Sequence, residues 1–291
     1  MLNPIPRPSR LIKLGILGLA SLLACPFVAL ASDGVAEINH TCAVLTGCFA
    51  GDTAGYPVTI DGQAGRSYRL TSDLIVPDEN TDGIAVDSSD VAIDLNGFAI
   101  IRSGCESATS NCTPTSGTGS GIEEVGSFRR GVSVKNGSIV GMGLYGIQLG
   151  TQSDLRGLRV RWNRVAGCNA DEDSIVSGIA AYQNGGFGIV TGTGTIVRAN
   201  TTSENGLDGI NAGSGSIVAE NASFLNGGDG IQAASGVTVQ RNTVRANGGY
   251  GLNLGSDSAF RENVITGNTA GSVNGGVNMA SNSCNGVTIC P

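Results

Sequence analysis

The chain has 291 residues, with 46 glycines, 40% hydrophobic residues and 4% aromatic residues. This composition is too rich in glycine for an ordinary helical domain and too apolar for a disordered chain. The formal charge of -7, from 17 basic and 24 acidic residues, argues against a nucleic-acid partner, because a basic surplus is needed to displace counterions from phosphates.

Residues 1–31 are predicted to be a secretory signal peptide. Basic residues precede the apolar run LGILGLASLLACPFVAL, and Ala29 to Ala31 provide the small residues of a cleavage site. Pro26 and this cleavage pattern disfavour an uncleaved anchor, and the apolar residues after Cys25 disfavour lipidation there. No later run is long and apolar enough to span a bilayer. We therefore expect a protein that is secreted, periplasmic or held at the cell surface, with no membrane span after cleavage.

Close cysteine pairs follow along the chain. Six of the eight cysteines form them: Cys42 with Cys48, Cys105 with Cys112, and Cys284 with Cys290. In an exported protein this spacing predicts three local disulfides. Metal ligation is the alternative, but these spacings differ from those of zinc sites, and His40 is the only histidine of the chain.

A period of 21 residues organises the second half of the chain. It is marked by the glycines Gly146, Gly167, Gly188, Gly209, Gly230 and Gly251. Two apolar columns predict the core: Ile147, Cys168, Ile189, Ile210, Ile231 and Leu252 at the second position, and Leu155, Val176, Val197, Val218, Val239 and Phe260 at the tenth. Two asparagine columns predict turns: Asn163, Asn184, Asn205, Asn226, Asn247 and Asn268, and Asn200, Asn221, Asn242 and Asn263. Because Cys168 shares a core column, we expect a buried thiol rather than a reactive one.

Short alternating runs of β-branched residues, separated by asparagine and glycine, predict strands and tight turns wound into a solenoid. Each unit has room for three strands of about four residues, and equivalent residues of adjacent coils would lie about 4.8 Å apart. Asparagine suits the turns because it tolerates the left-handed conformation and its amide can donate and accept hydrogen bonds along a ladder. A leucine-rich repeat has a similar period, but its leucine pattern is missing here.

The repeats resemble a known architecture. DGINAGSGSIVAENASFLNGG and its sister repeats resemble the right-handed parallel β-helix coils of the pectin-lyase-like superfamily, and SYRLTSDLIVPD with VAIDLNGFAI resembles the first coils of exported bacterial members of unassigned function. The resemblance covers roughly Tyr68 to Val277 and implies an all-β fold, a single-stranded right-handed parallel β-helix over residues 67–277. Because this architecture carries lyases, hydrolases, epimerases, adhesins and inert scaffolds, it implies no single activity.

The remaining segments are expected to complete the solenoid. Residues 32–66 and 278–291 carry cysteine pairs and lie where caps must cover the open edges of the end coils. The segment near residues 103–120 is rich in Ser, Thr and Gly and is pinned by its own cysteine pair. Because this segment is too long for a turn, we expect it to project from the solenoid.

The catalytic patterns that the resemblance suggests are missing from the sequence. Enzymes of the superfamily use a basic residue beside a uronate carboxylate, often with Ca²⁺, or a set of aspartates for hydrolysis. The only histidine, His40, lies in the N-terminal cap, so the Asp-Pro-His-Asp signature of alginate epimerases is absent. The Asn-Thr-Asp and Asp-Asp motifs of polygalacturonases are absent as well. The absence of these motifs therefore favours a protein without catalysis.

A charged cluster is one candidate site. It consists of Arg159 and Arg161 in one coil, flanked by Arg156 and Arg164, and of Asp171, Glu172 and Asp173 in the next. Acid beside base is compatible with a Ca²⁺-assisted lyase, but a solvated surface of compensating charges explains the same residues. Asp208 and Asp229 resemble calcium-binding nonapeptide repeats, yet they recur every 21 residues rather than every nine. We therefore predict no cofactor and no metal, with Ca²⁺ as the alternative.

A column of amides is the other candidate site. The third position of the repeat carries Gln148, Asn169, Asn211, Gln232 and Asn253, interrupted by Val190. These side chains follow an inward residue and should point outward if the strand alternates. Amides spaced by about 4.8 Å would match the repeat of an extended glycan. The alternative is that they bond to one another and hold the coils in register. Tyr182, Phe224 and Tyr250 would add surfaces on which sugars can stack.

We therefore expect an exported β-helix scaffold with a carbohydrate-associated or surface-interaction role and without catalysis. Its expected partner is a polysaccharide or a cell-surface glycan. The alternative is a polysaccharide lyase or another carbohydrate-active enzyme that acts on uronate-type glycans.

Overall fold

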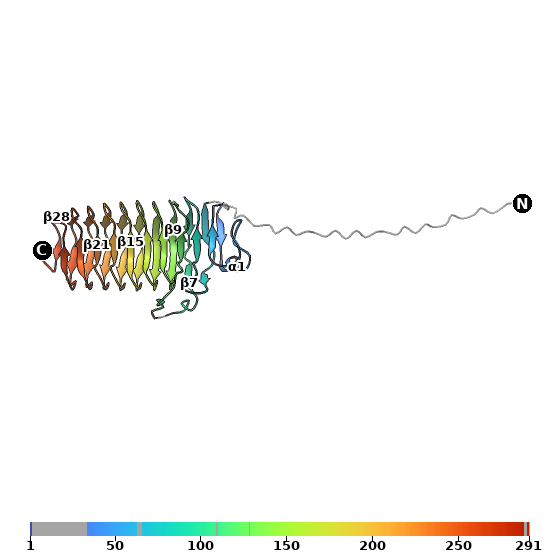
Figure 1. The fold of residues 1–291 in the computed structure, drawn as a ribbon, viewed down its shortest axis with the longest axis horizontal. Coiled ribbons are helices and arrows are strands. Elements are labelled where there is room, and N and C mark those ends of the chain that lie inside the picture. Colours follow the sequence, from blue (N-terminus) through green and yellow to red (C-terminus); the bar gives the residue numbers. More distant parts are fainter. Residues whose placement is uncertain (2–33, 63–65, 109, 128, 288–289, 291) are drawn as a thin grey trace.

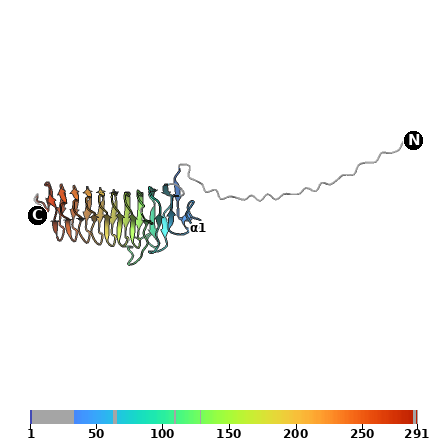
Figure 2. The ribbon, with the colours of Figure 1, turned by 45° about the horizontal axis from the view of Figure 1, so that its top comes forward.

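The computed structural model describes residues 1, 34–62, 66–108, 110–127, 129–287 and 290. Within them, coils of short parallel strands stack along one axis, from the helix α1 (His40–Leu45) to the C-terminus (Figures 1 and 2). The predicted signal peptide, residues 1–31, lies outside the described residues apart from Met1. The described helices include none with the length and apolar character of a membrane span.

The strands form three faces, numbered here in their order within a coil. Face 1 is a ten-stranded parallel sheet, and the next face in each coil is face 2. Face 1 contains β2 (Val58–Ile60), β5 (Ile84–Val86), β8 (Ile122–Glu124), β10 (Tyr145–Leu149), β12 (Ala166–Ala170), β15 (Phe187–Thr191), β18 (Ile210–Ala212), β21 (Ile231–Ala233), β24 (Tyr250–Leu254) and β27 (Gly271–Asn274).

Faces 2 and 3 share two long strands, β9 (Ser133–Val140) and β11 (Asp154–Arg161), which join them into one 19-stranded sheet. Face 2 also contains β1 (Ala36–Ile38), β3 (Ser67–Leu70), β6 (Ala92–Asp94), β13 (Ile175–Ser177), β16 (Ile196–Arg198), β19 (Ile217–Ala219), β22 (Thr238–Gln240), β25 (Ala259–Arg261) and β28 (Val277–Asn278). Face 3 also contains β4 (Leu74–Val76), β7 (Ala99–Arg102), β14 (Ala180–Tyr182), β17 (Thr201–Ser203), β20 (Ala222–Phe224), β23 (Thr243–Arg245), β26 (Val264–Thr266) and β29 (Ser283–Cys284).

The predicted coil of three short strands is confirmed. One coil gives β18, β19 and β20 to the three faces, and the next coil repeats this order with β21, β22 and β23. Ile210 pairs with Ile231, the residue 21 positions later. The ladders extend into the segments expected to be caps, because β2 pairs with β5 and β29 pairs with β26. The stacked strands therefore begin before residue 67 and end after residue 277.

The two apolar columns form the core, as the repeat predicts. Their side chains, from Ile147 to Leu252 and from Leu155 to Phe260, are buried inside the solenoid. Asn211 follows the buried Ile210 and is half-buried on the outer side of face 1, as strand alternation requires. Cys168 is a buried free cysteine, and burial raises the pKa of its thiol to about 12.

The two asparagine columns form hydrogen-bonded ladders inside the solenoid. Asn221 represents them: its Oδ1 accepts from the backbone N and the Nδ2 of Asn200, at 2.9 and 3.0 Å. Its own Nδ2 donates to the carbonyl of Val197 and to Oδ1 of Asn242, both at 3.0 Å. Each buried amide thus satisfies polar groups of neighbouring coils, which would otherwise be buried without partners.

The left-handed conformation falls on the residue before each asparagine, so the expectation that asparagine itself adopts it is wrong for these columns. Glu220, Arg241 and Glu262 have φ angles of 61°, 55° and 57°. Placing the sharp turn one residue earlier directs the asparagine side chain inward, where it can meet its neighbours. These three residues face solvent, and Arg241 pairs with Glu220 at 3.2 Å and with Glu262 at 3.8 Å.

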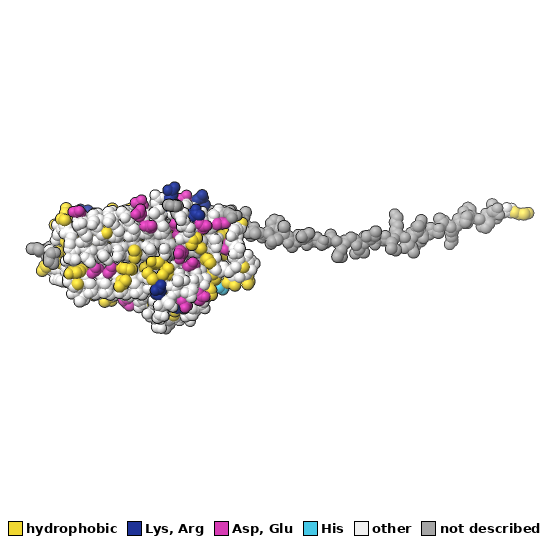
Figure 3. All heavy atoms as spheres, viewed as in Figure 1, with side chains coloured by type: hydrophobic (Ala, Val, Ile, Leu, Met, Phe, Trp, Pro, Cys, Tyr) yellow, Lys and Arg dark blue, Asp and Glu magenta, His cyan; other side chains and the backbone are white. Residues whose placement is uncertain are grey.

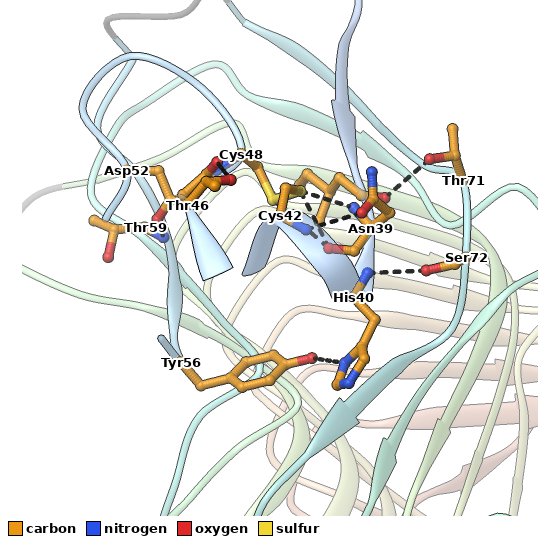
Figure 4. Close-up of a disulfide and its surroundings, with 12 residues drawn as sticks. Asn39, His40, Cys42, Thr46, Cys48, Asp52, Tyr56, Thr59, Thr71 and Ser72 are labelled. Atoms are coloured by element: carbon orange, nitrogen blue, oxygen red, sulfur yellow. Dashed lines mark hydrogen bonds between the residues drawn. A yellow bond between two sulfur atoms is a disulfide. The ribbon is translucent and has the colours of Figure 1, made fainter. Parts of the chain in front are cut away.

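The N-terminal end is closed by α1 and a disulfide (Figure 4). The side chain of Asn39 accepts a hydrogen bond from the backbone N of Cys42 at 2.9 Å, and Cys42 is bonded to Cys48. The Tyr56 hydroxyl lies 3.0 Å from Nδ1 of His40. Burial raises the pKa of Tyr56 to about 12, so this hydroxyl stays protonated and can donate to the imidazole. The histidine therefore has a structural partner in the cap.

The other two predicted disulfides also form. Cys105–Cys112 closes the loop between β7 and β8, which projects from the side of the solenoid as expected (Figure 1). Cys105 packs with Val140 and Trp162 in a small apolar cluster of its own. Cys284–Cys290 lies at the C-terminal end of the stack.

Replacing Asn221 with Ala should lower the free energy of unfolding by about 2–5 kcal/mol, because the N–H of Asn200 and the carbonyl of Val197 lose their buried partner. Chemical denaturation measures this loss. The matched control is Asn211→Ala on the outer side, where about 1 kcal/mol or less is expected. Equal losses in the two variants would contradict a structural role for the inner ladder.

The thiol of Cys168 should resist alkylation at pH 8 in the folded protein, because burial keeps it protonated and shields it from reagent. Denaturant should make it react within minutes. Peptide mass mapping after timed alkylation measures both rates at this residue alone. Rapid labelling under native conditions would contradict its place in the core.

Candidate functional site

A groove with a volume of about 540 Å³ opens on face 1, where β8, β10 and β12 end. Its lining is mostly polar: Glu124, Gly126, Arg129, Gln148, Leu149, Gly150, Thr151, Asn169 and Asp171. Small-ligand sites usually measure about 300–1,000 Å³, so the groove has the size of a binding site. It joins two residues of the predicted amide column, Gln148 and Asn169, to one acid of the predicted charged cluster, Asp171.

The amide column divides into an open part and a closed part. In the closed part, Asn211 Nδ2 donates to Gln232 Oε1 at 3.1 Å, and Asn253 Nδ2 donates to Asp229 Oδ2 at 2.7 Å. Within the described residues, the amides of Gln148 and Asn169 form no hydrogen bond. Bonding between amides, the alternative that the sequence left open, therefore occurs between Asn211 and Gln232, whereas Asn253 bonds to a carboxylate. The open part keeps its donors and acceptors free inside the groove.

The groove also holds two carboxylates and one guanidinium. Glu124 Oε2 accepts from the backbone N of Gly150 at 2.9 Å. Burial raises the pKa of Glu124, and Asp171 raises it further, against the opposing effects of the Gly150 N–H and Arg129. Arg129 donates through Nε and Nη2 to Oδ1 of Asp87, at 3.0 and 2.7 Å. Since this cation is already paired with Asp87, the groove has a surplus of negative charge.

Three charged residues of this region escaped the sequence analysis, namely Glu123, Glu124 and Arg129. Glu123 pairs in register with Gln148, so the amide column begins with a carboxylate, whose pKa burial also raises. The sequence gives one indication that Glu123 belongs to this column, because Gly121-Ile122-Glu123 matches the start of the later repeats. However, Gly121 lies 25 residues before Gly146, so it falls outside the strict period.

The structure does not bring the predicted charged cluster together. Arg159 and Arg161 project from the face 3 part of β11, whereas Asp171, Glu172 and Asp173 lie in the turn between β12 and β13, which joins faces 1 and 2. Arg156 pairs within its own strand with Asp154, at 2.6 Å. The arginines and the acids of this cluster therefore lie on different parts of the coil.

The carboxylates that resemble calcium ligands hold backbone turns. Asp208 accepts from the backbone N of Asp229 at 2.7 Å, and Asp229 accepts from the backbone N of Tyr250 at 2.6 Å. Burial raises the pKa of Asp208, the hydrogen bond from the Asp229 backbone N–H opposes this rise, and the charge of Asp229 adds a smaller increase. No group of three or more His, Cys, Asp and Glu side chains with the arrangement of a metal site occurs among the described residues.

Comparison with known proteins supports the β-helix fold. A family model described as the right handed beta helix region matches residues 145–289. The protein has the fold of a right-handed parallel β-helix. No curated protein matches the sequence.

Solved structures share the β-helix at low sequence identity. The periplasmic alginate epimerase AlgG is 14% identical, with a TM-score of 0.54 over 82% of this chain and 80% of that chain. The A-module of the mannuronan C-5 epimerase AlgE6 from Azotobacter vinelandii is 16% identical, with a TM-score of 0.53 over 82% of this chain and 68% of that chain. At these identities the likeness shows a common fold alone. The lone histidine of this β-helix, His40, lies in the N-terminal cap rather than among the residues that line the groove.

Replacing Glu124 with Gln should increase the thermal stability slightly at pH 7 and leave it unchanged at pH 4. Because burial raises the pKa of Glu124 in the folded state, ionisation starts to oppose folding as the pH rises above the unfolded pKa, and the full effect is reached above the folded pKa. Glutamine cannot ionise and still offers an oxygen to the Gly150 N–H. Thermal unfolding at both pH values measures the difference, and Glu172→Gln in the exposed turn is the control. A loss of stability at pH 7 would contradict the raised pKa.

Proposed function

We propose that this protein is an exported scaffold that binds a polysaccharide along face 1, with its main contact in the groove beside β8, β10 and β12. The observation that carries the proposal is the pair of amides, Gln148 and Asn169, that have no hydrogen-bond partner within the described structure. The amides farther along the same column are bonded to neighbours. Free amides on successive rungs offer both donors and acceptors to the hydroxyls of a sugar chain.

The groove chemistry favours a glycan without acidic groups. The described strands of face 1 contain the carboxylates Glu123 and Glu124 and no lysine or arginine. Asp171 adds a third carboxylate, and Arg129 is paired with Asp87. Carboxylates accept hydrogen bonds from neutral hydroxyls but repel a uronate polymer unless a cation lies between them. Face 1 is therefore suited to a neutral or amino-sugar glycan.

Export supports a role at a cell surface or in the periplasm. Residues 1–31 have the sequence pattern of a secretory signal peptide, and three disulfides form within the described residues. In this proposal the mature protein consists of the β-helix with its disulfide-bearing end segments, residues 32–66 and 278–291. A rigid solenoid of this kind can present one binding face to an extended polymer.

A carbohydrate-active enzyme is the second candidate, favoured by the pair Glu124 and Asp171 in one groove. A carboxyl group with a raised pKa, such as that of Glu124, can serve as a proton donor in glycoside chemistry when a second carboxyl group lies in the same groove. Incubation with neutral glycans, and with uronate polymers with and without Ca²⁺, tests this candidate by new reducing ends and by double-bond absorbance. Product that disappears in Glu124→Gln would establish catalysis, while retention of the glycan without product supports the scaffold.

The double variant Gln148→Ala with Asn169→Ala should weaken retention on the bound polysaccharide at least about tenfold, since each lost hydrogen bond is worth about 1 kcal/mol. Affinity electrophoresis through gels that contain neutral polysaccharides measures retention. The matched control is Asn211→Ala with Gln232→Ala, which removes two bonded amides from the same column. If the control loses retention and the groove variant keeps it, the contact lies in the closed part of the column.

A further inference from the structure

The three faces differ sharply in charge. In the described strands, face 1 carries acidic residues without basic ones, and face 2 carries both kinds. On face 2, Arg69 pairs with Glu37 at 3.8 Å and Lys135 pairs with Asp94 at 3.5 Å. The described strands of face 3 contain arginines and no aspartate or glutamate. In the view of Figure 3, acidic side chains are spread along the solenoid and basic ones gather at a few points.

Face 3 has a second groove, with a volume of about 260 Å³. Four adjacent strands supply its lining: Ala99 and Ile101 from β7, Ser138 and Val140 from β9, Arg159 and Arg161 from β11, and Tyr182 from β14. The register sets Val140 beside Arg161 and Arg161 beside Tyr182. The outer positions of these rungs thus place apolar side chains, two cations and one aromatic ring side by side.

The two arginines of this groove have no anionic partner in the described part of the chain. Within the described residues, neither Arg159 nor Arg161 forms an ion pair or a side-chain hydrogen bond. Other arginines of the same region are used in the fold, since Arg164 donates to the carbonyls of Gly143 and Gly117 at 2.6 and 2.9 Å, and Arg156 pairs with Asp154. Two unpaired guanidinium groups on a protein of net charge -7 form a local site of attraction for an anion.

The groove is held in shape by its surroundings. The guanidinium carbon of Arg161 lies 4.0 Å from the ring centroid of the buried Trp162, whose Nε1 donates to Gln183 Oε1 at 2.9 Å. Trp162 packs in turn against Cys105 of the disulfide-closed loop. Stacking on an aromatic ring fixes the plane of a guanidinium group while leaving its N–H donors free.

We propose that this face 3 groove binds one sugar residue that carries an anionic substituent, as a site separate from the face 1 groove. Arg159 and Arg161 bind the anionic group through charge-assisted hydrogen bonds. The ring of Tyr182 and the apolar wall of Ile101 and Val140 contact the C–H face of the sugar. A volume below the usual range of about 300–1,000 Å³ restricts the groove to a single residue or a chain end. The protein would therefore hold two chemically different glycans on different faces.

Binding of defined oligosaccharides to the full protein, measured by titration calorimetry at low and at physiological salt, tests this proposal. The probes are oligomers of galacturonate, which carry carboxylates, sulfated galactose oligomers, and neutral galactose oligomers. We expect at least one anionic probe to bind more tightly than its neutral match, with affinity falling as salt rises. Arg159→Gln should weaken that binding about 10- to 100-fold, and Tyr182→Ala should weaken it as well. The preferred probe identifies the anionic group.

Arg245→Gln is the matched control, because Arg245 lies on the same face, stacked on Phe224 at 4.7 Å and four rungs from Arg161. It should change the affinity less than about twofold, the range of a surface substitution. Equal losses for Arg159→Gln and Arg245→Gln would overturn the proposal in favour of general charge attraction. Absence of binding by both anionic probes at millimolar concentration would also overturn it.

The face 1 variant Gln148→Ala with Asn169→Ala separates the two proposals. It should leave the affinity for the anionic oligosaccharide unchanged while it weakens retention on neutral polysaccharide. Loss of the anionic ligand in this variant, together with its retention in Arg159→Gln, would place that ligand on face 1 and overturn the face 3 site. Failure of the neutral glycan alone would overturn the face 1 proposal and leave the face 3 site standing.

Discussion

The hydrogen-bonded register between coils is the constraint on which the rest of the structure depends. Parallel strands pair residues 21 positions apart, and the buried asparagines repeat that pairing inside the turns, as in the contacts of Asn221 with Asn200 and Asn242. An insertion within a coil is tolerated only if it leaves the ladder, as the disulfide-closed loop between β7 and β8 does. The register therefore fixes which side chains share a column, and the columns fix the surface chemistry.

Because the register fixes the backbone, outward positions are free to differ from face to face. The same strand alternation that buries Ile210 leaves Asn211 on the outside, and a column of such positions runs the length of each face. In parts of a column, hydrogen bonds between neighbouring side chains occupy their donors and acceptors, as between Asn211 and Gln232. A side chain without such a hydrogen bond is available to a ligand. Within the described residues, this is the case for Gln148 and Asn169 on face 1 and for the two arginines of the face 3 groove.

The sequence predicted the fold in detail because each column repeats its own chemistry, so the core, the ladders and the coil of three strands follow from the spacing alone. It located the left-handed residues incorrectly, since propensity favours asparagine there while the burial of its amide requires the turn to come one residue earlier. It missed Glu124 because the coil that begins at Gly121 has 25 residues. The division of the amide column into free and bonded members depends on side-chain contacts such as that of Asn253 with Asp229, which residue spacing does not specify.

The separation of charge among the faces has a consequence for binding. A single mixed surface would satisfy its own ion pairs, as face 2 does through Arg69 and Lys135, and would offer little to a ligand beyond weak, screened attraction. Keeping carboxylates on face 1 and unpaired arginines on face 3 preserves both for external partners. The solenoid core separates the faces, so a ligand on one face does not have to displace a partner on the other. Under the two proposals above, one molecule holds two unlike glycans, each with its own salt dependence.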